Sequence, residues 1–282
     1  MSERQLEPSI RRILVGLDAS RHSLAALEAA SELAAALNAE LVGIFVEDIN
    51  LLHLAGLPFA REVRYLSSAE YPLDSLAMER GLRLQAAQLR QTLAGIAGKR
   101  QLQWSFRVVR GQVSTELLAA AQGADLLALG RASWASTRRV RLGATAREVV
   151  AQALPSVLLL QQGHSVCAPV QLVYDGSPAA ERAVATAVHM ASITGGHLIV
   201  TVVADAAEIA HRLQGEVEER LQVRPIKGDY RQLIKPTAEE LAQVLRAAGG
   251  GTLIISADHP LLAGEGLYTL LDAIDCSVFL VR

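Results

Sequence analysis

The sequence predicts an α/β protein made of two tandem domains, each a doubly wound parallel sheet of five strands. Three observations lead to this prediction. Short apolar runs alternate with alanine-rich segments of helical spacing, the pattern of the first half recurs in the second, and a length of 282 residues suits two domains of ordinary size. We expect the domains to span residues 1–163 and 164–282.

The strands of the first half are predicted from apolar runs of strand length, and the helices from apolar residues at helical spacing. The expected strands cover residues 13–17, 41–46, 104–109, 126–129 and 157–160. The expected helices run from residue 20 to 37, 76 to 96, 115 to 121 and 144 to 153. Residues 48–75, with Gly56, Pro58 and Pro72, are expected to form a long loop with room for a short helix.

The second half repeats the first strand and the turn after it, because Val170–Ser177 matches Ile13–Ser20 at an offset of 157 positions. The same offset places Leu27 opposite Val184 and Leu41 opposite Leu198, so the core-facing positions recur in register. The second half is shorter, mainly because it has no counterpart of the long loop. Duplication of one domain explains these matches.

The overall composition excludes several classes of protein. With 27 basic and 29 acidic residues the net charge is -2, whereas a dedicated nucleic-acid-binding protein is usually basic. The two cysteines, Cys167 and Cys276, form neither a CxxC pair nor a disulfide framework, which favours a reducing cytoplasm. The charged amino terminus does not resemble a secretory signal, and the apolar runs are too short for a membrane span.

Candidate binding residues lie where the strands of the first half end. Ligands of an open parallel sheet bind beyond the carboxyl ends of its strands, so Asp18, Val46, Leu129 and Gly130 should meet at one crevice. The start of the helix after Gly143 would present backbone amides to an anion. Five arginines, at 131, 138, 139, 141 and 147, and no acidic residue occur between Gly130 and Glu148. These features predict a phosphate site that includes Arg131; the alternative is that the arginines form an ordinary solvated rim.

The matching stretch of the second half has the opposite charge. Residues 257–274 contain Asp258, Glu265 and Asp272 and no lysine or arginine. This charge would repel a polyphosphate, so the first half is expected to bind the ligand and the second half to serve a structural or regulatory role.

The Asp after the first strand, together with the spacing of Gly130, Ser133, Gly143 and the residues after it, resembles the universal stress protein family in a tandem, two-domain form. The family motif is G-x2-G-x9-G-[ST]; here Ser133 replaces the second glycine, and Ala144 replaces the hydroxyl residue that Thr145 carries one position later. The resemblance implies Rossmann-like sheets of the adenine nucleotide alpha hydrolase type.

For the nucleotide-binding members of the family, the resemblance implies a site for ATP, ADP or AMP, with Mg²⁺ as a possible companion of the nucleotide. Asp18 and Val46 would lie against the adenine and ribose. The residues expected around the phosphates are Gly130, Ser133, Gly143, Ala144 and Thr145.

In the second half the resemblance implies only a vestigial site. Asp175 is retained and Gly264 matches Gly143, but Ser256 and His259 stand in place of the first two glycines. Asp18 and Asp175 also have a simpler alternative as strand ends or helix caps. The resemblance further suggests that strands 157–160 and 278–281 pair across a pseudo-two-fold axis, and it leaves a homodimer open.

The function that the sequence favours is therefore a stress-response binding protein, with no catalytic residue assigned. One alternative is a protein-interaction or chaperone-like module that takes an apolar ligand or none. Another is a slow nucleotide hydrolase that uses Asp18. The seven histidines are dispersed along the chain without the spacing of metal ligands, so no metal site is expected.

Overall fold

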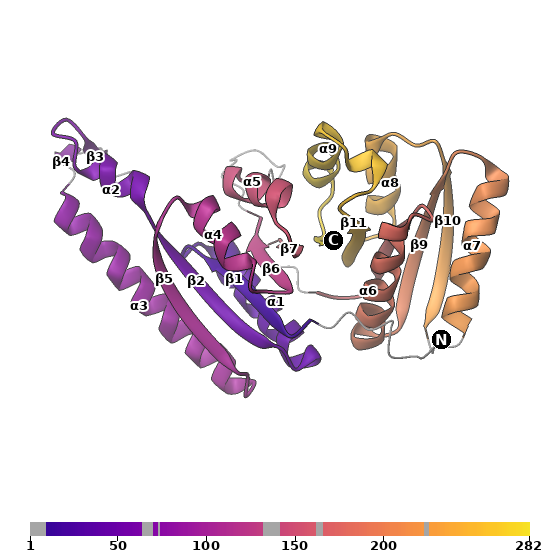
Figure 1. Ribbon diagram of the computed structural model, residues 1–282, viewed down its shortest axis with the longest axis horizontal. Coiled ribbons are helices and arrows are strands. Elements are labelled where there is room, and N and C mark those ends of the chain that lie inside the picture. Colours follow the sequence, from indigo (N-terminus) through magenta and orange to yellow (C-terminus); the bar gives the residue numbers. More distant parts are fainter. Residues whose placement is uncertain (1–9, 64–69, 73, 132–141, 162–165, 223–225) are drawn as a thin grey trace.

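The centre of the molecule is a ten-stranded sheet with helices on both faces (Figure 1). The computed structural model describes residues 10–63, 70–72, 74–131, 142–161, 166–222 and 226–282. The strand order is β10-β9-β8-β11-β12-β7-β6-β1-β2-β5. The α/β class with largely parallel strands is thus as predicted.

Strands and helices alternate through the first half of the chain. Its elements are β1 (Arg12–Leu17), α1 (Arg21–Leu37), β2 (Glu40–Asp48), α2 (Ile49–Ala55), β3 (Arg61–Val63), β4 (Glu70–Pro72), α3 (Ser75–Lys99), β5 (Trp104–Gly111), α4 (Val113–Ala121), β6 (Leu126–Gly130), α5 (Ala144–Gln152) and β7 (Ser156–Leu160).

The second half has the same alternation with fewer elements. They are β8 (Val170–Tyr174), α6 (Pro178–Thr194), β9 (His197–Ala204), α7 (Ala207–Gln222), β10 (Lys227–Ile234), α8 (Ala238–Ala247), β11 (Thr252–Ser256), the 3-10 helix η2 (Pro260–Leu262), α9 (Glu265–Ala273) and β12 (Ser277–Val281).

The two halves of the sheet have the same internal order and meet at their last strands. Within each half of the ten-stranded sheet all pairs are parallel, whereas β7 and β12 pair antiparallel, with Val157 opposite Leu280 and Leu159 opposite Val278. The structure therefore contains the two predicted sets of five strands, but they form one continuous sheet instead of two separate ones. Both joining strands are almost wholly buried, and left apart each would expose an unpaired apolar edge.

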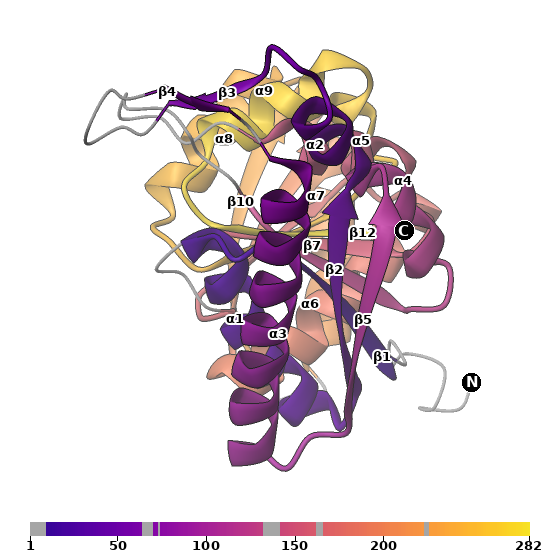
Figure 2. The same cartoon turned by 90° about the vertical axis from the view of Figure 1, so that its left-hand side faces the viewer.

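Side chains that alternate along the strands feed two apolar layers. On β1, Ile13, Val15 and Leu17 pack into one layer and Leu14 into the other, and each layer also contains residues of the second half. Figure 2 shows β2 and β5 lying between α3 and α4, which cover opposite faces. Burial on both faces explains why these strands read as nearly continuous apolar runs.

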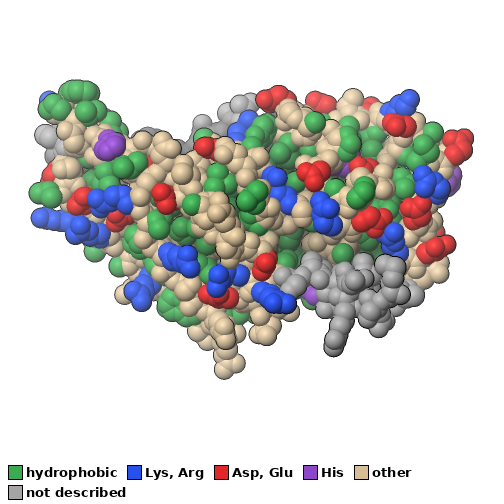
Figure 3. Space-filling view, viewed as in Figure 1, with side chains coloured by type: hydrophobic (Ala, Val, Ile, Leu, Met, Phe, Trp, Pro, Cys, Tyr) green, Lys and Arg blue, Asp and Glu red, His purple; other side chains and the backbone are tan. Residues whose placement is uncertain are grey.

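The long loop expected over residues 48–75 has more structure than the sequence indicates. Asp48 caps α2 by accepting a hydrogen bond from the Asn50 amide, and β3 and β4 form a small antiparallel pair. Apolar side chains gather on this part of the surface, at the upper left of Figure 3. The exposed members are Leu51, Leu54, Leu57 and Phe59.

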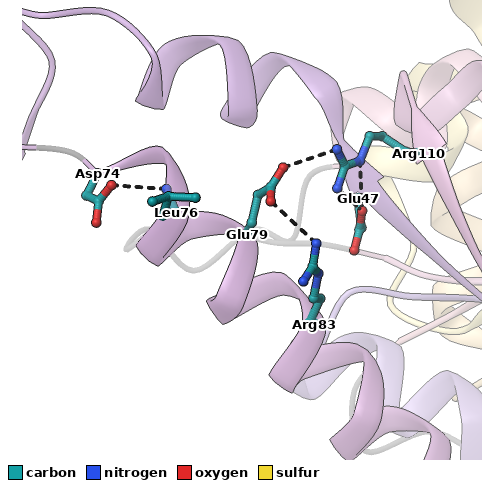
Figure 4. A network of polar contacts seen from close by, with 6 residues as sticks. All are labelled: Glu47, Asp74, Leu76, Glu79, Arg83 and Arg110. Atoms are coloured by element: carbon teal, nitrogen blue, oxygen red, sulfur yellow. Dashed lines mark hydrogen bonds and ion pairs between the residues drawn. The ribbon is translucent and has the colours of Figure 1, made fainter.

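An ion-pair network attaches the start of α3 to the sheet (Figure 4). Arg110 of β5 donates to Glu47 of β2 at 2.9 Å and to Glu79 of α3 at 3.2 Å, and Glu79 also pairs with Arg83. Hydrogen bonding to Glu47 raises the pKa of Arg110. Glu47 follows Val46 in the strand and therefore points to the opposite face of the sheet, away from the site described next.

Among the described helices, none is both long and apolar enough to cross a membrane.

Candidate functional site

A cleft of about 610 Å³ opens at the carboxyl ends of β1, β2 and β6 in the first half. Its walls come from the strand ends, the first turn of α1, one face of α4 and the start of α5. The lining residues are Gly16, Leu17, Asp18, Ser20, His22, Ser23, Ile44, Val46, Val113, Leu117, Leu129, Gly130, Leu142, Gly143, Ala144, Thr145 and Ala146.

One part of the cleft is apolar because of strand and helix periodicity. Ile44 and Val46 lie two residues apart on β2 and so face the same side, where they join Leu117 of α4 in one buried layer. Helical spacing places Val113 beside Leu117 on that face. These residues together form an apolar surface of the kind that accepts a flat, weakly polar ring.

The turn between β1 and α1 supplies the polar edge. Asp18 Oδ1 accepts a hydrogen bond from the Ser20 amide at 3.0 Å, and Ser20 caps α1 by accepting from the Ser23 amide at 3.1 Å. Ala19 has a φ of 61°, which allows the chain to reverse between them. Asp18 therefore lies two residues before the N-cap residue Ser20, and its hydrogen bond to the Ser20 amide holds the carboxylate in place. The Asp18 side chain is exposed to the cleft.

Packing against α1 requires glycine at position 130. A Cβ atom at this position would lie 2.6 Å from the backbone carbon and oxygen of His22, in the first turn of α1. Backbone cannot yield in the way that a flexible side chain can, so a larger residue would push α1 away from the end of β6. His22 itself lines the cleft, and its buried Nδ1 has no hydrogen-bond partner among the described residues.

The start of α5 forms the opposite wall. Gly143 is the N-cap residue and offers no side-chain cap, while Ala144, Thr145 and Ala146 line the cleft. The first amides of a helix have no partner within the helix and carry partial positive charge. The amides of this wall can therefore donate hydrogen bonds to negatively charged oxygen atoms.

Most of the residues predicted from sequence meet at this cleft. Asp18, Val46, Leu129, Gly130, Gly143, Ala144 and Thr145 all line it. Ser133 lies outside the described residues. Sequence reasoning missed His22, although it lies in the helical turn directly after Asp18, and it missed Val113 and Leu117, whose signal is the helical spacing after the edge strand.

The prediction that the Arg131 side chain helps to hold an anion is wrong. The Arg131 guanidinium is completely buried and donates to the backbone oxygens of Ile274 at 3.1 Å, Cys276 at 3.4 Å and Leu271. Those oxygens lie at and beyond the carboxyl end of α9, which carries partial negative charge and attracts a cation. Burial lowers the pKa of Arg131.

Arg147, also expected at the phosphate site, points toward α9 as well. It forms an ion pair with Asp272 at 2.7 Å, and its guanidinium carbon lies 4.7 Å from the centre of the Tyr268 ring. Arg138, Arg139 and Arg141 lie outside the described residues. The two arginines that the structure describes therefore bind the second half instead of facing the cleft.

The equivalent place in the second half is occupied by its own chain. Asp175 Oδ1 accepts from the Ser177 amide at 3.0 Å, as Asp18 does from Ser20, but Asp175 Oδ2 lies 3.7 Å from Nε2 of the buried His259. Burial lowers the pKa of His259, and the Asp175 charge opposes that shift in part. Ser256 accepts from the Asp258 amide, and Gly264, with a φ of 59°, precedes α9.

Among the described residues, no group of three or more His, Cys, Asp or Glu side chains is placed to hold a metal ion.

The cleft and its sheet belong to the part of the chain that a known family explains. The model of the universal stress protein family matches residues 9–161, which is more than half of the sequence. The chain belongs to the universal stress protein family. The matched range ends just after β7, so it contains every residue that lines the cleft.

Solved universal stress proteins share the fold along almost the entire chain. One from Archaeoglobus fulgidus DSM 4304 is 14% identical, with a TM-score of 0.75, and the match covers 96% of this chain and 98% of that one. A putative universal stress protein from Pseudomonas aeruginosa UCBPP-PA14 is 16% identical, with a TM-score of 0.61 and coverage of 97% and 94%. No curated protein matches this chain in sequence.

Proposed function

We propose that this universal stress protein binds an adenine nucleotide, ATP, ADP or AMP, in the cleft of its first half. The observation that supports this proposal best is that the residues expected at a nucleotide site lie together. Residues from four separate stretches of sequence, each expected at a nucleotide site, line one cleft of about 610 Å³ that is apolar in one part and bounded by a helix start in another.

In this proposal the adenine ring lies on the apolar surface of Ile44, Val46 and Leu117, where burial of a flat ring is favourable. Asp18 accepts a hydrogen bond from the ribose or the base. A hydrogen bond to a charged group contributes about 1.5–3 kcal/mol, which suits a residue that the β1–α1 turn already holds in place.

The phosphates lie at the start of α5, held by backbone amides and by the Thr145 hydroxyl. Ala144 offers no hydroxyl, and Arg131 and Arg147 are engaged elsewhere, so the helix start has the larger role among the described residues. Asp18 is the carboxylate of the described lining that could approach Mg²⁺ carried by the nucleotide.

Isothermal titration of nucleotide-stripped protein tests the proposal, with Ala144→Glu as the decisive variant. Glu265 occupies the equivalent place at the start of α9, so the variant copies the second half into the first. An acidic residue in the first turn stabilises a helix, so the fold should be retained while the phosphates are repelled. We expect the wild type to bind ATP and the variant to bind it about tenfold more weakly or worse, about 1.4 kcal/mol.

Glu265→Ala is the matched control, because it changes the charge at the equivalent helix start away from the cleft, and its affinity should equal that of the wild type. The proposal fails if the wild type gives no heat with ATP, ADP or AMP at millimolar concentration, or if Ala144→Glu binds as well as the wild type.

A chaperone-like function is the second candidate, and the exposed apolar side chains around α2 favour it. Phe59 is 75% exposed and Leu54 48% exposed, on a segment that the second half does not have. This function predicts that the protein suppresses aggregation of a heat-denatured test protein, and that joint replacement of Leu54 and Phe59 by serine abolishes the suppression. Unchanged suppression by that variant would contradict it.

A further inference from the structure

The phosphate-facing wall of the cleft is held in place from the other half of the chain. Asp272 of α9 accepts a hydrogen bond from the Leu142 amide through Oδ1, at 2.9 Å, and pairs with Arg147 Nη2 through Oδ2, at 2.7 Å. Leu142 and Arg147 lie on either side of residues 143–146, the turn that lines the cleft. One carboxylate thus fixes both ends of this turn.

A second residue of α9 reinforces the contact. Tyr268 lies one helical turn before Asp272, so both side chains project from the same face of α9. The Arg147 guanidinium lies over the Tyr268 ring, and the Tyr268 hydroxyl donates to the Arg147 backbone oxygen at 3.4 Å. Arg147 Nε also donates to the Leu142 oxygen at 3.4 Å, which closes the turn on itself.

The support is itself firmly attached to the first half. Arg131, directly after β6, binds the backbone oxygens of Leu271, Ile274 and Cys276 at the end of α9. Asp272 follows Leu271 directly, so the carboxylate cannot move far without breaking the contacts of a fully buried guanidinium. The side chains of Asp272 and Arg147 are 25% and 37% exposed, so solvent screens their ion pair in part.

The two residues that Asp272 contacts, Leu142 and Arg147, flank the first amides of α5. Amides at a helix start bind an anion well only when they already point at it, because ordering them during binding would cost free energy. The carboxylate that accepts the hydrogen bond of the Leu142 amide belongs to Asp272. This residue lies outside residues 9–161, the range that the family model matches.

We propose that Asp272 is a positioning residue for the phosphate-binding wall, and that the carboxyl-terminal half thereby sets the affinity of the cleft for the phosphates of its ligand. This inference rests on the proposed nucleotide function for its ligand. Its structural step, the fixing of residues 142–147 by Asp272, does not depend on any ligand.

The test compares Asp272→Ala, Asp272→Asn and a matched control, Asp258→Ala. Asp258 belongs to the same half and forms an exposed ion pair with Arg182, so the control removes the same charge without breaking the contacts of Asp272 with residues 142 and 147. In nucleotide-free protein, hydrogen exchange of the peptide covering residues 142–147 should be about tenfold faster or more in Asp272→Ala, and unchanged in the control. Asp272→Asn keeps an acceptor for the Leu142 amide and should be intermediate.

Titration with AMP and with adenosine separates positioning from a general loss of structure. Adenosine has no phosphate, so Asp272→Ala should bind it like the wild type, while its affinity for AMP falls about tenfold. Unchanged hydrogen exchange would overturn the inference, as would an equal loss of affinity for both ligands. If exchange accelerates as expected but wild-type protein binds no nucleotide, the positioning step stands and the proposed function fails.

Discussion

At the scale of single residues, the two halves differ in what lies against the same aspartate. Asp18 and Asp175 each accept a hydrogen bond from the amide two residues later, at 3.0 Å. Asp18 remains exposed to the cleft, whereas Asp175 faces the buried His259. One carboxylate is thus available to a ligand, and the other has a partner within the chain.

The buried His259 predicts a loss of stability in mild acid. Burial lowers its pKa below the ordinary 6.5, so the unfolded chain binds a proton more readily than the folded protein does. Stability should therefore be complete above about pH 6.5 and fall as the pH drops from there toward the folded-state pKa. Urea unfolding at several pH values measures this slope, which His259→Gln should reduce.

His53→Gln is the control for this measurement, because it removes an exposed histidine instead of a buried one. Equal slopes in wild-type protein and His259→Gln would contradict the prediction.

The arginines mark the limit of sequence reasoning at this scale. Their sequence context, free of acidic residues, predicted an anion site. Arg131, however, binds backbone oxygens 140 to 145 positions further along the chain. Backbone oxygens leave no trace in a residue pattern, so only the tertiary structure could reveal that contact. Asp18, Val46 and Gly130 were predictable because strand ends follow directly from apolar periodicity.

At the scale of elements, the apolar periodicity of the sequence predicted most helices and strands but did not predict the strands within residues 48–75. The periodic runs placed α1, α3 and the large strands to within a few residues, and Ser20 and Ser177 act as caps where the chain enters α1 and α6. The pair β3–β4 was not predicted. It has three residues in each strand, too few for an alternating pattern to be recognised.

Helix α3 contains glycines that nothing in its surroundings requires. A Cβ atom at Gly95 would meet no atom within 4 Å apart from the neighbouring backbone of its own helix, and the residue is exposed in the interior of the helix. Gly95→Ala should raise the free energy of unfolding by up to about 1 kcal/mol, because alanine loses less backbone freedom on folding. Thermal unfolding checks this increase.

Gly130→Ala provides the contrast, since its Cβ would lie 2.6 Å from the His22 backbone and should lower the melting temperature. A Gly95→Ala protein no more stable than the wild type would contradict the prediction for α3.

At the scale of the whole molecule, the halves are joined by a sheet, by two shared apolar layers and by α5 and α9. The repeat in the sequence indicated two similar units, and the resemblance suggested that residues 157–160 and 278–281 pair. In the structure Val157–Leu159 lies antiparallel to Val278–Leu280. The contacts of α9 with α5 were not predictable, because they join side chains that no local pattern relates.

Arg131 should be the most sensitive polar contact between the halves. In Arg131→Met the backbone oxygens at the end of α9 lose their donor while they remain buried, which should lower the free energy of unfolding by about 3 kcal/mol or more. Chemical denaturation measures the change. Arg212→Met, which removes an exposed ion pair within α7, should have little effect, and similar losses in both variants would contradict this role.

The pairing of β7 with β12 also reduces the number of strand edges at which the sheet could aggregate. Two separate sheets would present four outermost strands, each able to recruit a foreign strand, whereas the joined sheet presents two, β5 and β10. Charged side chains occur on both, among them Arg107 on β5 and Lys227 and Asp229 on β10, where burial by an added strand would strip them of water. The two apolar edge strands, β7 and β12, thus cover each other, and the strands that remain at the edges of the sheet, β5 and β10, carry charged side chains.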